Sequence, residues 1–216
     1  MTIHRDLDVL VRRGTIIKVR GGARSVRHTG DLGYDIRLQE NVDGKLLMAE
    51  KALELIQPHA TIFLDAGTTN LTLSRKLPDI PMNIFTTGPN IAMELCRLQN
   101  PNITLCCGTL NRKNMALSGQ NTQEMLDHIN LDIAFIGVSG CYADAGFTCG
   151  TEGDMLVKRL VIQKARTSVV MCTQEKLRCL MPYTFATMKD VDYLISDSPM
   201  PEPFQNAARE CGTILL

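Results

Sequence analysis

Aromatic residues and long apolar runs are scarce in this chain. It contains no tryptophan, and aromatic residues make up 5% of its 216 residues. A membrane-spanning helix needs about eighteen or more consecutive apolar residues, and no segment approaches that length. The N-terminus also lacks the charged and then apolar layout of a secretory signal. We therefore expect a cytoplasmic protein without a transmembrane helix.

The motifs of metal, disulfide and nucleotide sites are missing as well. The eight cysteines include no C-x-x-C pair, and the four histidines share no spacing. The sequence therefore predicts neither a metal site nor a cofactor, and the cysteines are expected to be reduced thiols. No G-x-x-x-x-G-K-[ST] string occurs, which excludes a P-loop kinase.

The charge of the chain is balanced overall but unevenly distributed. Residues 1–30 carry seven Lys or Arg against two acidic residues, whereas the other 186 residues carry 16 basic and 21 acidic side chains. A basic N-terminal segment on an acidic body is typical of a protein of which only one end contacts a polyphosphate such as DNA.

The basic segment has the pattern of a helix followed by a hairpin. Apolar residues recur on one face of the expected helix at Ile3, Leu7 and Leu10, which leaves a basic face exposed, and Gly14 ends it. The β-branched run Thr15–Val19 then leads to a basic residue and a glycine pair, which indicates a short hairpin with a basic tip. A helix, a glycine and a basic hairpin are the final elements of a winged helix.

Helical and strand patterns alternate through the rest of the chain. Residues 24–44 are polar and indicate a linker, and Lys45–Gln57 is amphipathic and ends before Pro58. Apolar strands between helices predict a Rossmann-like, mostly parallel α/β sheet covered on both faces. The expected strands are 61–64, 83–86, 103–107, 133–138, 168–172, 193–196 and the edge strand 213–216, and the later helices are 69–77, 90–98, 122–129, 154–165 and 204–210.

The string Asp65–Thr69, D-A-G-T-T, follows the first expected strand and opens a helix. Ligands of such sheets bind at the carboxyl ends of the strands. Gly67 lets the backbone approach a ligand, Thr68 and Thr69 offer hydroxyl groups, and the helix N-terminus offers free amides and the positive end of its dipole. The string predicts a phosphate site, although helix capping by either threonine explains it equally well.

The ordered motifs of the chain resemble those of the DeoR family of bacterial transcriptional regulators. Near the N-terminus the matches are to the second helix and wing of its winged helix, at Thr2, Ile3, Arg5, Asp6, Leu7, Gly14 and Gly21–Ala23. In the body the matches follow the order of its sensor domain, at Asp65–Thr69, Thr86, Gly108–Leu110, Ile136–Gly140, Lys158 and Lys176.

The resemblance implies a sugar-phosphate isomerase-type fold that binds a small phosphorylated sugar or sugar acid as effector. It divides the chain into a partial winged helix-turn-helix over residues 1–23, the linker 24–44 and an effector-binding domain over residues 45–216. The implied effector-binding residues are Asp65, Gly67, Thr68, Thr69, Thr86, Gly108, Gly137, Ser139, Glu152, Lys158 and Lys176. The implied DNA-binding residues are Thr2, His4, Arg5, Arg12, Arg13, Lys18 and Arg20.

The chain departs from the family pattern at several pocket positions. Thr87 replaces an asparagine, Cys107 replaces the first glycine of a pair, Thr173–Glu175 replaces an aspartate-led run, and Arg178 replaces a glycine. We interpret these changes as the mark of an altered effector rather than of lost sensing, because the D-A-G-T-T string, Glu152 and Lys158 remain.

The N-terminal segment departs from the family as well. His4 stands where an arginine is usual, and the first two helices of the winged helix lie upstream of the position that Met1 matches. A recognition helix normally rests on a preceding helix, and a short isolated helix is marginal in water. We therefore expect this polypeptide to bind operator DNA weakly or only through its charge.

These features predict a DNA-binding regulator, a repressor of a carbohydrate-utilisation operon, that works as a homo-oligomer (a dimer or tetramer). One alternative is an effector-binding protein that has lost DNA binding. Another is an isomerase-like enzyme, which needs a positioned carboxylate or histidine. The isomerase pattern has its base before the helix lysine, where this chain has Val157, and an acidic loop where it has Ser139-Gly140. We therefore expect no catalytic residue.

Overall fold

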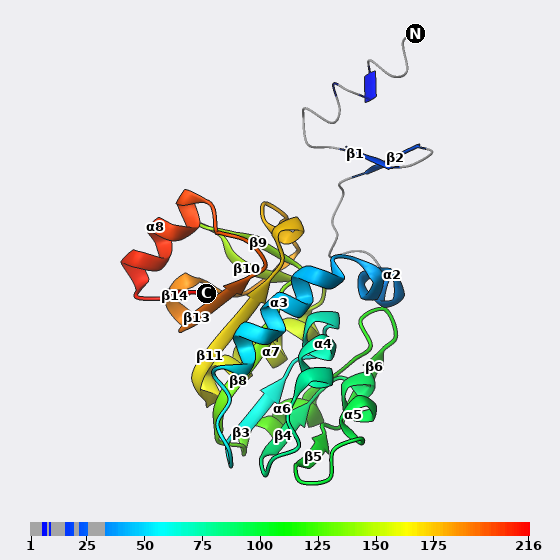
Figure 1. The fold of residues 1–216 in the computed structure, drawn as a ribbon, viewed down its shortest axis with the longest axis vertical. Helices are drawn as coiled ribbons and strands as arrows, with labels where there is room; N and C mark the ends of the chain where they lie inside the picture. The colour runs from blue at the N-terminus through cyan, green and yellow to red at the C-terminus, as the bar shows by residue number, and fades with distance from the viewer. Residues whose placement is uncertain (1–5, 8, 10–15, 20–21, 26–32) are drawn as a thin grey trace.

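A seven-stranded parallel sheet forms the centre of the molecule (Figure 1). The computed structural model describes residues 6–7, 9, 16–19, 22–25 and 33–216. The strands of this sheet are β3 (Thr61–Leu64), β4 (Asn83–Thr86), β5 (Asn102–Leu105), β8 (Leu131–Gly137), β11 (Ala165–Cys172), β13 (Tyr193–Ser196) and β14 (Ile214–Leu215). Their order is β14-β13-β11-β8-β3-β4-β5, and each neighbouring pair is parallel. The predicted Rossmann-like sheet is confirmed.

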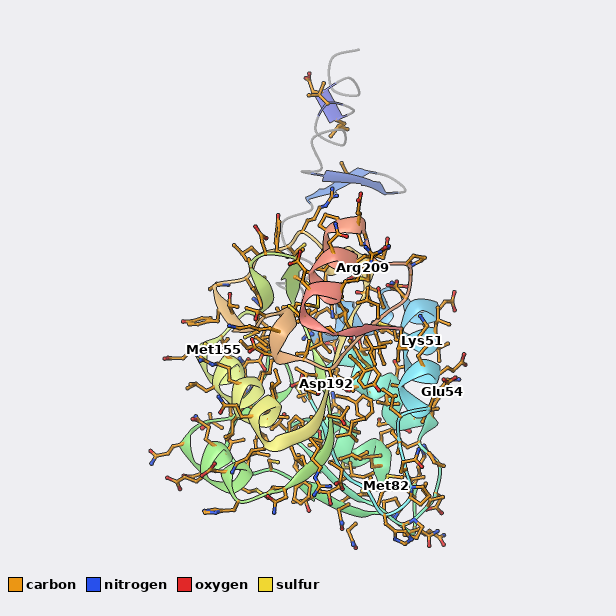
Figure 2. All side chains as sticks on the ribbon, turned by 90° about the vertical axis from the view of Figure 1, so that its left-hand side faces the viewer. Lys51, Glu54, Met82, Met155, Asp192 and Arg209 are labelled. Atoms are coloured by element: carbon orange, nitrogen blue, oxygen red, sulfur yellow. The ribbon has the colours of Figure 1, made fainter. Side chains whose placement is uncertain are left out.

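Helices cover both faces of this sheet. One face carries α3 (Val42–Leu53), α4 (Thr68–Lys76) and α5 (Pro89–Leu95), and the other carries α6 (Gln120–Asp127), α7 (Glu152–Lys164) and α8 (Glu202–Cys211). Figure 2 shows the two layers from the side, with Met155 of α7 on one side of the sheet and Lys51 of α3 on the other. Each predicted helix of the body is therefore present, with ends shifted by a few residues.

The alternation of side chains along a buried strand divides the core into two halves. On β8, Ile133 and Phe135 pack against the α3–α4–α5 layer, whereas Ala134 and Ile136 pack against the α6–α7–α8 layer. All four side chains are buried, as expected for the central strand of a parallel sheet. Because β8 packs against both helix layers, it holds them in place relative to the carboxyl ends of the strands.

Two smaller β elements were not predicted. Strands β9 (Gly140–Tyr142), β10 (Gly146–Cys149) and β12 (Tyr183–Ala186) form an antiparallel sheet in the order β12-β10-β9. Strands β6 (Thr109–Asn111) and β7 (Ala116–Ser118) form a hairpin. Two 3₁₀ turns, η2 (Gln174–Lys176) and η3 (Met188–Asp190), complete this part of the chain. These strands lie outside the alternation of strands and helices from which the central sheet was predicted.

The segment expected as a linker contains a helix. Residues Tyr34–Gln39 form α2, and α3 begins at Val42, three residues before the predicted start. Asn41 caps α3 from a left-handed backbone conformation, and its side-chain oxygen accepts a hydrogen bond from the amide of Gly44 at 3.1 Å. Asparagine tolerates this conformation and is a favoured N-cap, so the cap at Asn41 explains the early start.

The described part of the N-terminal segment agrees with the predicted helix and hairpin. Asp6, Leu7 and Val9 are helical, and β1 (Ile16–Val19) pairs antiparallel with β2 (Gly22–Ser25). Thr2, His4, Arg5, Arg12, Arg13 and Arg20, all predicted to contact DNA, lie outside the described residues, and of Lys18 only the backbone is described. Among the described residues, no helix is long and apolar enough to cross a membrane.

Candidate anion-binding site

The candidate site lies where the strand order of the sheet reverses, between β3 and β8. From β3 the chain continues through β4 to β5 in one direction, and from β8 it continues through β11 to β13 in the other. Ligands of open α/β sheets bind at the carboxyl ends of the strands at such a switch point. Asp65, which follows β3, spans this point, because its Oδ2 accepts a hydrogen bond from the amide of Gly137 at 3.0 Å.

A buried ion-pair cluster forms the inner wall of the site. Lys158 on α7 donates hydrogen bonds to the Asp65 carboxylate and to the carbonyl of Gly137, the latter at 2.8 Å. Asp154, one turn earlier, lies 3.5 Å from the same ammonium. The side chains of Lys158 and Asp65 are 5% and 4% exposed. Lys158 thus joins α7 to the ends of β3 and β8.

Burial and the attraction of opposite charges act against each other in this cluster. Burial alone would lower the pKa of Lys158, but Asp154 and Asp65 outweigh it and hold that pKa above its ordinary value. Burial raises the pKa of Asp154, and the attraction of Lys158 opposes that rise. The Lys158 ammonium is therefore charged and already faces two carboxylates. Asp154 is thus a partner of Lys158 on the same helix, and Glu152 is not among the partners of Lys158.

The N-terminus of α4 forms a second wall. Gly67 is its N-cap residue, and no side chain caps the helix. Neither threonine therefore has the capping role that was the alternative to phosphate binding. The hydroxyl-bearing residues Thr68 and Thr69 line the cavity together with Gly67. A Cβ atom added at Gly67 would meet nothing within 4 Å, so the backbone is open on this side. Free amides at a helix start attract anions.

Two cations that face the cavity complete the site. Lys176 of η2 was predicted, and Arg37 of α2 was not; both line the same cavity as Thr68. Burial lowers the pKa of Lys176 to about 8, and the neighbouring charges of Arg37, Lys45 and Lys158 contribute to the decrease. Within the described residues, no carboxylate pairs with the Lys176 ammonium. A partly buried ammonium surrounded by other cations favours an anionic ligand.

A second small cavity adjoins the first and shares Arg37, Thr68 and Lys176 with it. Its other lining residues include Asn41, Lys45, Thr173 and Glu175. The ammonium of Lys45 is buried and donates hydrogen bonds to the last carbonyls of α2, those of Arg37 and, at 2.6 Å, of Glu40. The two cavities have volumes of about 20 and 30 Å³, so each holds about one water molecule.

Most of the predicted effector residues line the first cavity. They are Asp65, Gly67, Thr68, Thr69, Gly137, Ser139, Lys158 and Lys176. Arg37, Asn114 and Asp154 were not among the predicted effector-binding residues, yet all three line the cavity. Asn114 lies in the turn of the β6–β7 hairpin, which was itself not predicted. Arg37 lies in a segment that was expected to be a linker.

Three predicted effector residues do not line either cavity. The hydroxyl of Thr86 donates to the carbonyl of Leu64 at 2.7 Å and accepts from the amide of Gly88 at 3.0 Å, so Thr86 joins β4 to β3. Gly108 has a φ of 139°, and a Cβ atom there would collide with the hydroxyl of Thr122. Glu152 is an exposed residue in the first turn of α7, where a carboxylate suits the helix dipole.

The positions that depart from the family pattern have different roles. Thr87 is buried, and its carbonyl accepts a hydrogen bond from the amide of Leu117. Cys107 is exposed. Arg178 has a φ of 61°, a left-handed conformation that explains why a glycine is usual there. Of these positions, Thr173 and Glu175, which belong to one replaced run, line the second cavity. One of these departures therefore reaches the site.

The fold and the comparisons with known proteins define a family. A protein-family model described as "DeoR C terminal sensor domain" matches residues 40–198 of this chain. The HTH-type transcriptional regulator GlpR of Haloferax volcanii is 30% identical over 100% of this chain and 85% of its own length. The HTH-type transcriptional repressor GlcR of Bacillus subtilis is 30% identical over 100% of this chain and 83% of its own. The chain belongs to the DeoR family, and these relatives are named as regulators, not as enzymes.

Comparison with solved structures gives matches at low sequence identity. The eIF2B delta chain of Chaetomium thermophilum matches with a TM-score of 0.53 and 12% identity, over 77% of this chain and 60% of that one. Ribose 5-phosphate isomerase A of Methanocaldococcus jannaschii matches with a TM-score of 0.48 and 21% identity, over 64% of this chain and 55% of its own. This chain therefore spans little more than half of each of those proteins.

Proposed function

We propose that this protein is a transcriptional regulator, a repressor of a carbohydrate-utilisation operon, that senses a small phosphorylated sugar or sugar acid. The observation that carries the proposal is the meeting of an uncapped helix N-terminus, at Thr68 and Thr69, with the ammonium of Lys176. Amide groups at a helix start and an adjacent cation bind a phosphate dianion. Asp65 and Asn114 are acceptors or donors for the hydroxyl groups of a sugar at the same cavity.

The proposed partner at the other end of the chain is operator DNA. In this proposal, residues 1–23 belong to a winged helix-turn-helix and residues 45–216 to the effector-binding domain. The basic excess of residues 1–30 supports contact with phosphates, and the relatives are named as HTH-type regulators. We also propose a homo-oligomer, a dimer or tetramer, because twofold operators mirror twofold proteins.

We propose that the cavity binds its ligand without converting it. Isomerisation of a sugar phosphate needs a carboxylate or imidazole that accepts a proton next to the carbonyl group. Asp65 and Asp154 are the carboxylates that line the cavity, and both lie against Lys158. A carboxylate that is bound to a buried ammonium has to give up that ion pair when it accepts a proton, which opposes its use as a base.

A thermal-shift screen tests the proposal. The protein is titrated with glycerol 3-phosphate, ribose 5-phosphate, fructose 1-phosphate, fructose 6-phosphate and glucose 6-phosphate, and each unphosphorylated compound serves as its control. A ligand of the folded state adds about 2.7 kcal/mol of stability at a hundredfold excess over its Kd. We expect a phosphate-dependent increase in melting temperature with at least one compound.

Two variants localise that response. Thr68→Val removes a cavity hydroxyl with little change of volume and should weaken binding about tenfold. Thr104→Val on the edge strand β5, outside both cavities, is the matched control and should bind as the wild type does. A screen in which no phosphate ester shifts the melting temperature would overturn the proposal, as would equal binding by the two variants.

A further inference from the structure

The effector cavity has one wall that differs from the others. Lys158, Asp65 and Gly137 hold the inner wall together by direct hydrogen bonds, and seven residues of α4 are buried. Among the six residues of α2, by contrast, only Tyr34 is buried, and Ile36 is 50% exposed. Segments with few buried contacts open at low free energy. Helix α2 is therefore less firmly anchored than α4 and the inner wall.

The cavities are too small for a sugar phosphate as they stand. A cavity needs about 10–15 Å³ to hold one water molecule, so cavities of about 20 and 30 Å³ admit only one or two waters each. Occupation by a phosphate ester therefore requires a wall to move. Displacement of α7 or the strand ends would break the buried Lys158–Asp65 pair. Displacement of α2 exposes Tyr34 and the partly buried Leu38 and loosens the hydrogen bonds of Lys45, but it separates no buried ion pair.

The side chain that α2 contributes to the site is Arg37. It lines both cavities, its guanidinium lies 5.7 Å from the centre of the Tyr34 ring, and it belongs to the segment between the β1–β2 hairpin and the sensor domain. Guanidinium groups bind phosphate and carboxylate through paired hydrogen bonds. An anion in the cavity would therefore meet a ligand that comes from the connecting segment.

The other walls of the second cavity tie α2 to η2. The amide nitrogen of Asn41, just after α2, donates to the carboxylates of Glu175 and Asp197, both at 2.7 Å. Asp197 in turn accepts from the backbone amide of Gln174 at 2.9 Å. The connecting segment is thus bonded to the turn that carries Lys176, so an anion between Arg37 and Lys176 acts on both at once.

We propose that Arg37 is an effector-binding residue and that α2 is the movable wall through which occupancy of the cavity reaches the segment that leads to the β1–β2 hairpin. This inference rests on the proposed function, because it concerns the same site. Arg37 recruits the anion, α2 repositions to admit the ligand, and the Asn41 contacts pass the change between α2 and η2. The effector thereby acts on the connecting segment directly rather than through the core of the sheet.

Ligand binding by two arginine variants tests the role of Arg37. The phosphate ester that gives the largest shift in the screen is titrated into Arg37→Gln and into Arg166→Gln, where Arg166 is an exposed residue on β11. We expect the Kd to rise about ten- to a hundredfold for Arg37→Gln and to stay unchanged for Arg166→Gln. Arg37→Lys, which keeps the charge but not the paired geometry, should fall between them.

Hydrogen exchange of the wild-type protein tests the movement of α2. The same ligand should change the exchange rate of residues 34–40 by severalfold or more, while residues 131–137 of β8 keep theirs. Unchanged exchange of residues 34–40, or wild-type affinity of Arg37→Gln, would overturn the inference while leaving the proposed function intact. If no phosphate ester binds the wild type, the proposed function itself fails and the inference fails with it.

Discussion

The central sheet has an amino edge, where its parallel strands begin, and a carboxyl edge, where they end. The two edges use aspartate in opposite ways. At the amino edge, Asp132 accepts a hydrogen bond from the amide of Thr61 at 2.9 Å, and Asp192 accepts one from the amide of Ser168 at 2.7 Å. Both aspartates are exposed residues. At the carboxyl edge, Asp65 is buried and its carboxylate contacts an ammonium. At the amino edge, exposed carboxylates accept backbone hydrogen bonds next to water. At the carboxyl edge, a carboxylate and an ammonium are buried together.

The pKa values of two aspartates follow this difference. Hydrogen bonds from the amides of Asn100 and Gln99 lower the pKa of the exposed Asp79, just before β4. Burial raises the pKa of Asp154 at the site. Buried charge is costly unless it is paired, and a fold that needed only stability would have little reason to enclose it. The enclosed charge at the carboxyl edge therefore supports the proposal that the ligand binds there.

Among the variants that test the difference between the two edges, removal of Lys158 should have the largest effect on stability. Lys158→Met leaves two buried carboxylates without their cation, and we expect the free energy of unfolding to fall by about 3–5 kcal/mol. The matched control is Lys164→Met at the other end of α7, whose ammonium lies 2.9 Å from an exposed Asp127. An exposed pair is worth at most about 1 kcal/mol. Urea denaturation measures both values.

A second variant separates charge from packing. Adding Asp65→Asn to Lys158→Met removes one of the unpaired charges, so part of the lost stability should return. An equal decrease in the free energy of unfolding for Lys158→Met and Lys164→Met would show that the buried ion pair contributes no more to stability than the exposed one.

Lys176 should make ligand binding at the carboxyl edge depend on pH. Its pKa of about 8 in the folded chain lies below the ordinary 10.5 of lysine. Ligand affinity should therefore fall as the pH rises through about 8, by up to about tenfold per pH unit, because the ammonium loses its charge. The phosphate ester is already a dianion there, since its second pKa is about 6. Calorimetric titration from pH 6.5 to 9.5 measures the decline.

Lys176→Gln is the control for that decline. It should bind the ligand more weakly at pH 7 and lose the decrease of affinity around pH 8. The pKa of Lys176 is about 8 in the folded chain and 10.5 in the unfolded chain. Between these two values the folded chain binds fewer protons at Lys176 than the unfolded chain does. This group therefore makes the ligand-free wild type more stable as the pH rises from about 8 to 10.5. The variant should lack that rise. A wild-type affinity that is constant between pH 7 and 9 contradicts this role of Lys176.

The sequence predicts the parts of the site that depend on local pattern. Asp65, Thr68 and Gly137 lie at strand ends and at a helix start, and apolar periodicity locates these features. Arg37 could not be recognised, because its place at the cavity results from the packing of Tyr34 against the core. Asn114 depends on a hairpin whose strands have three residues each. The missed residues are those positioned by contacts distant in sequence.

The smallest expected effect is at the amino edge, where Asp132→Ala removes the acceptor of the Thr61 amide. A hydrogen bond next to water contributes about 1 kcal/mol, and water replaces part of what is lost, so the free energy of unfolding should fall by about 1 kcal/mol or less. The affinity for the phosphate ester should not change, because Asp132 lines neither of the cavities at the carboxyl edge. Urea denaturation and a ligand titration of this variant give both numbers. A change in affinity without a comparable change in stability would mean that the amino edge also takes part in binding, and the functional division between the two edges would be wrong.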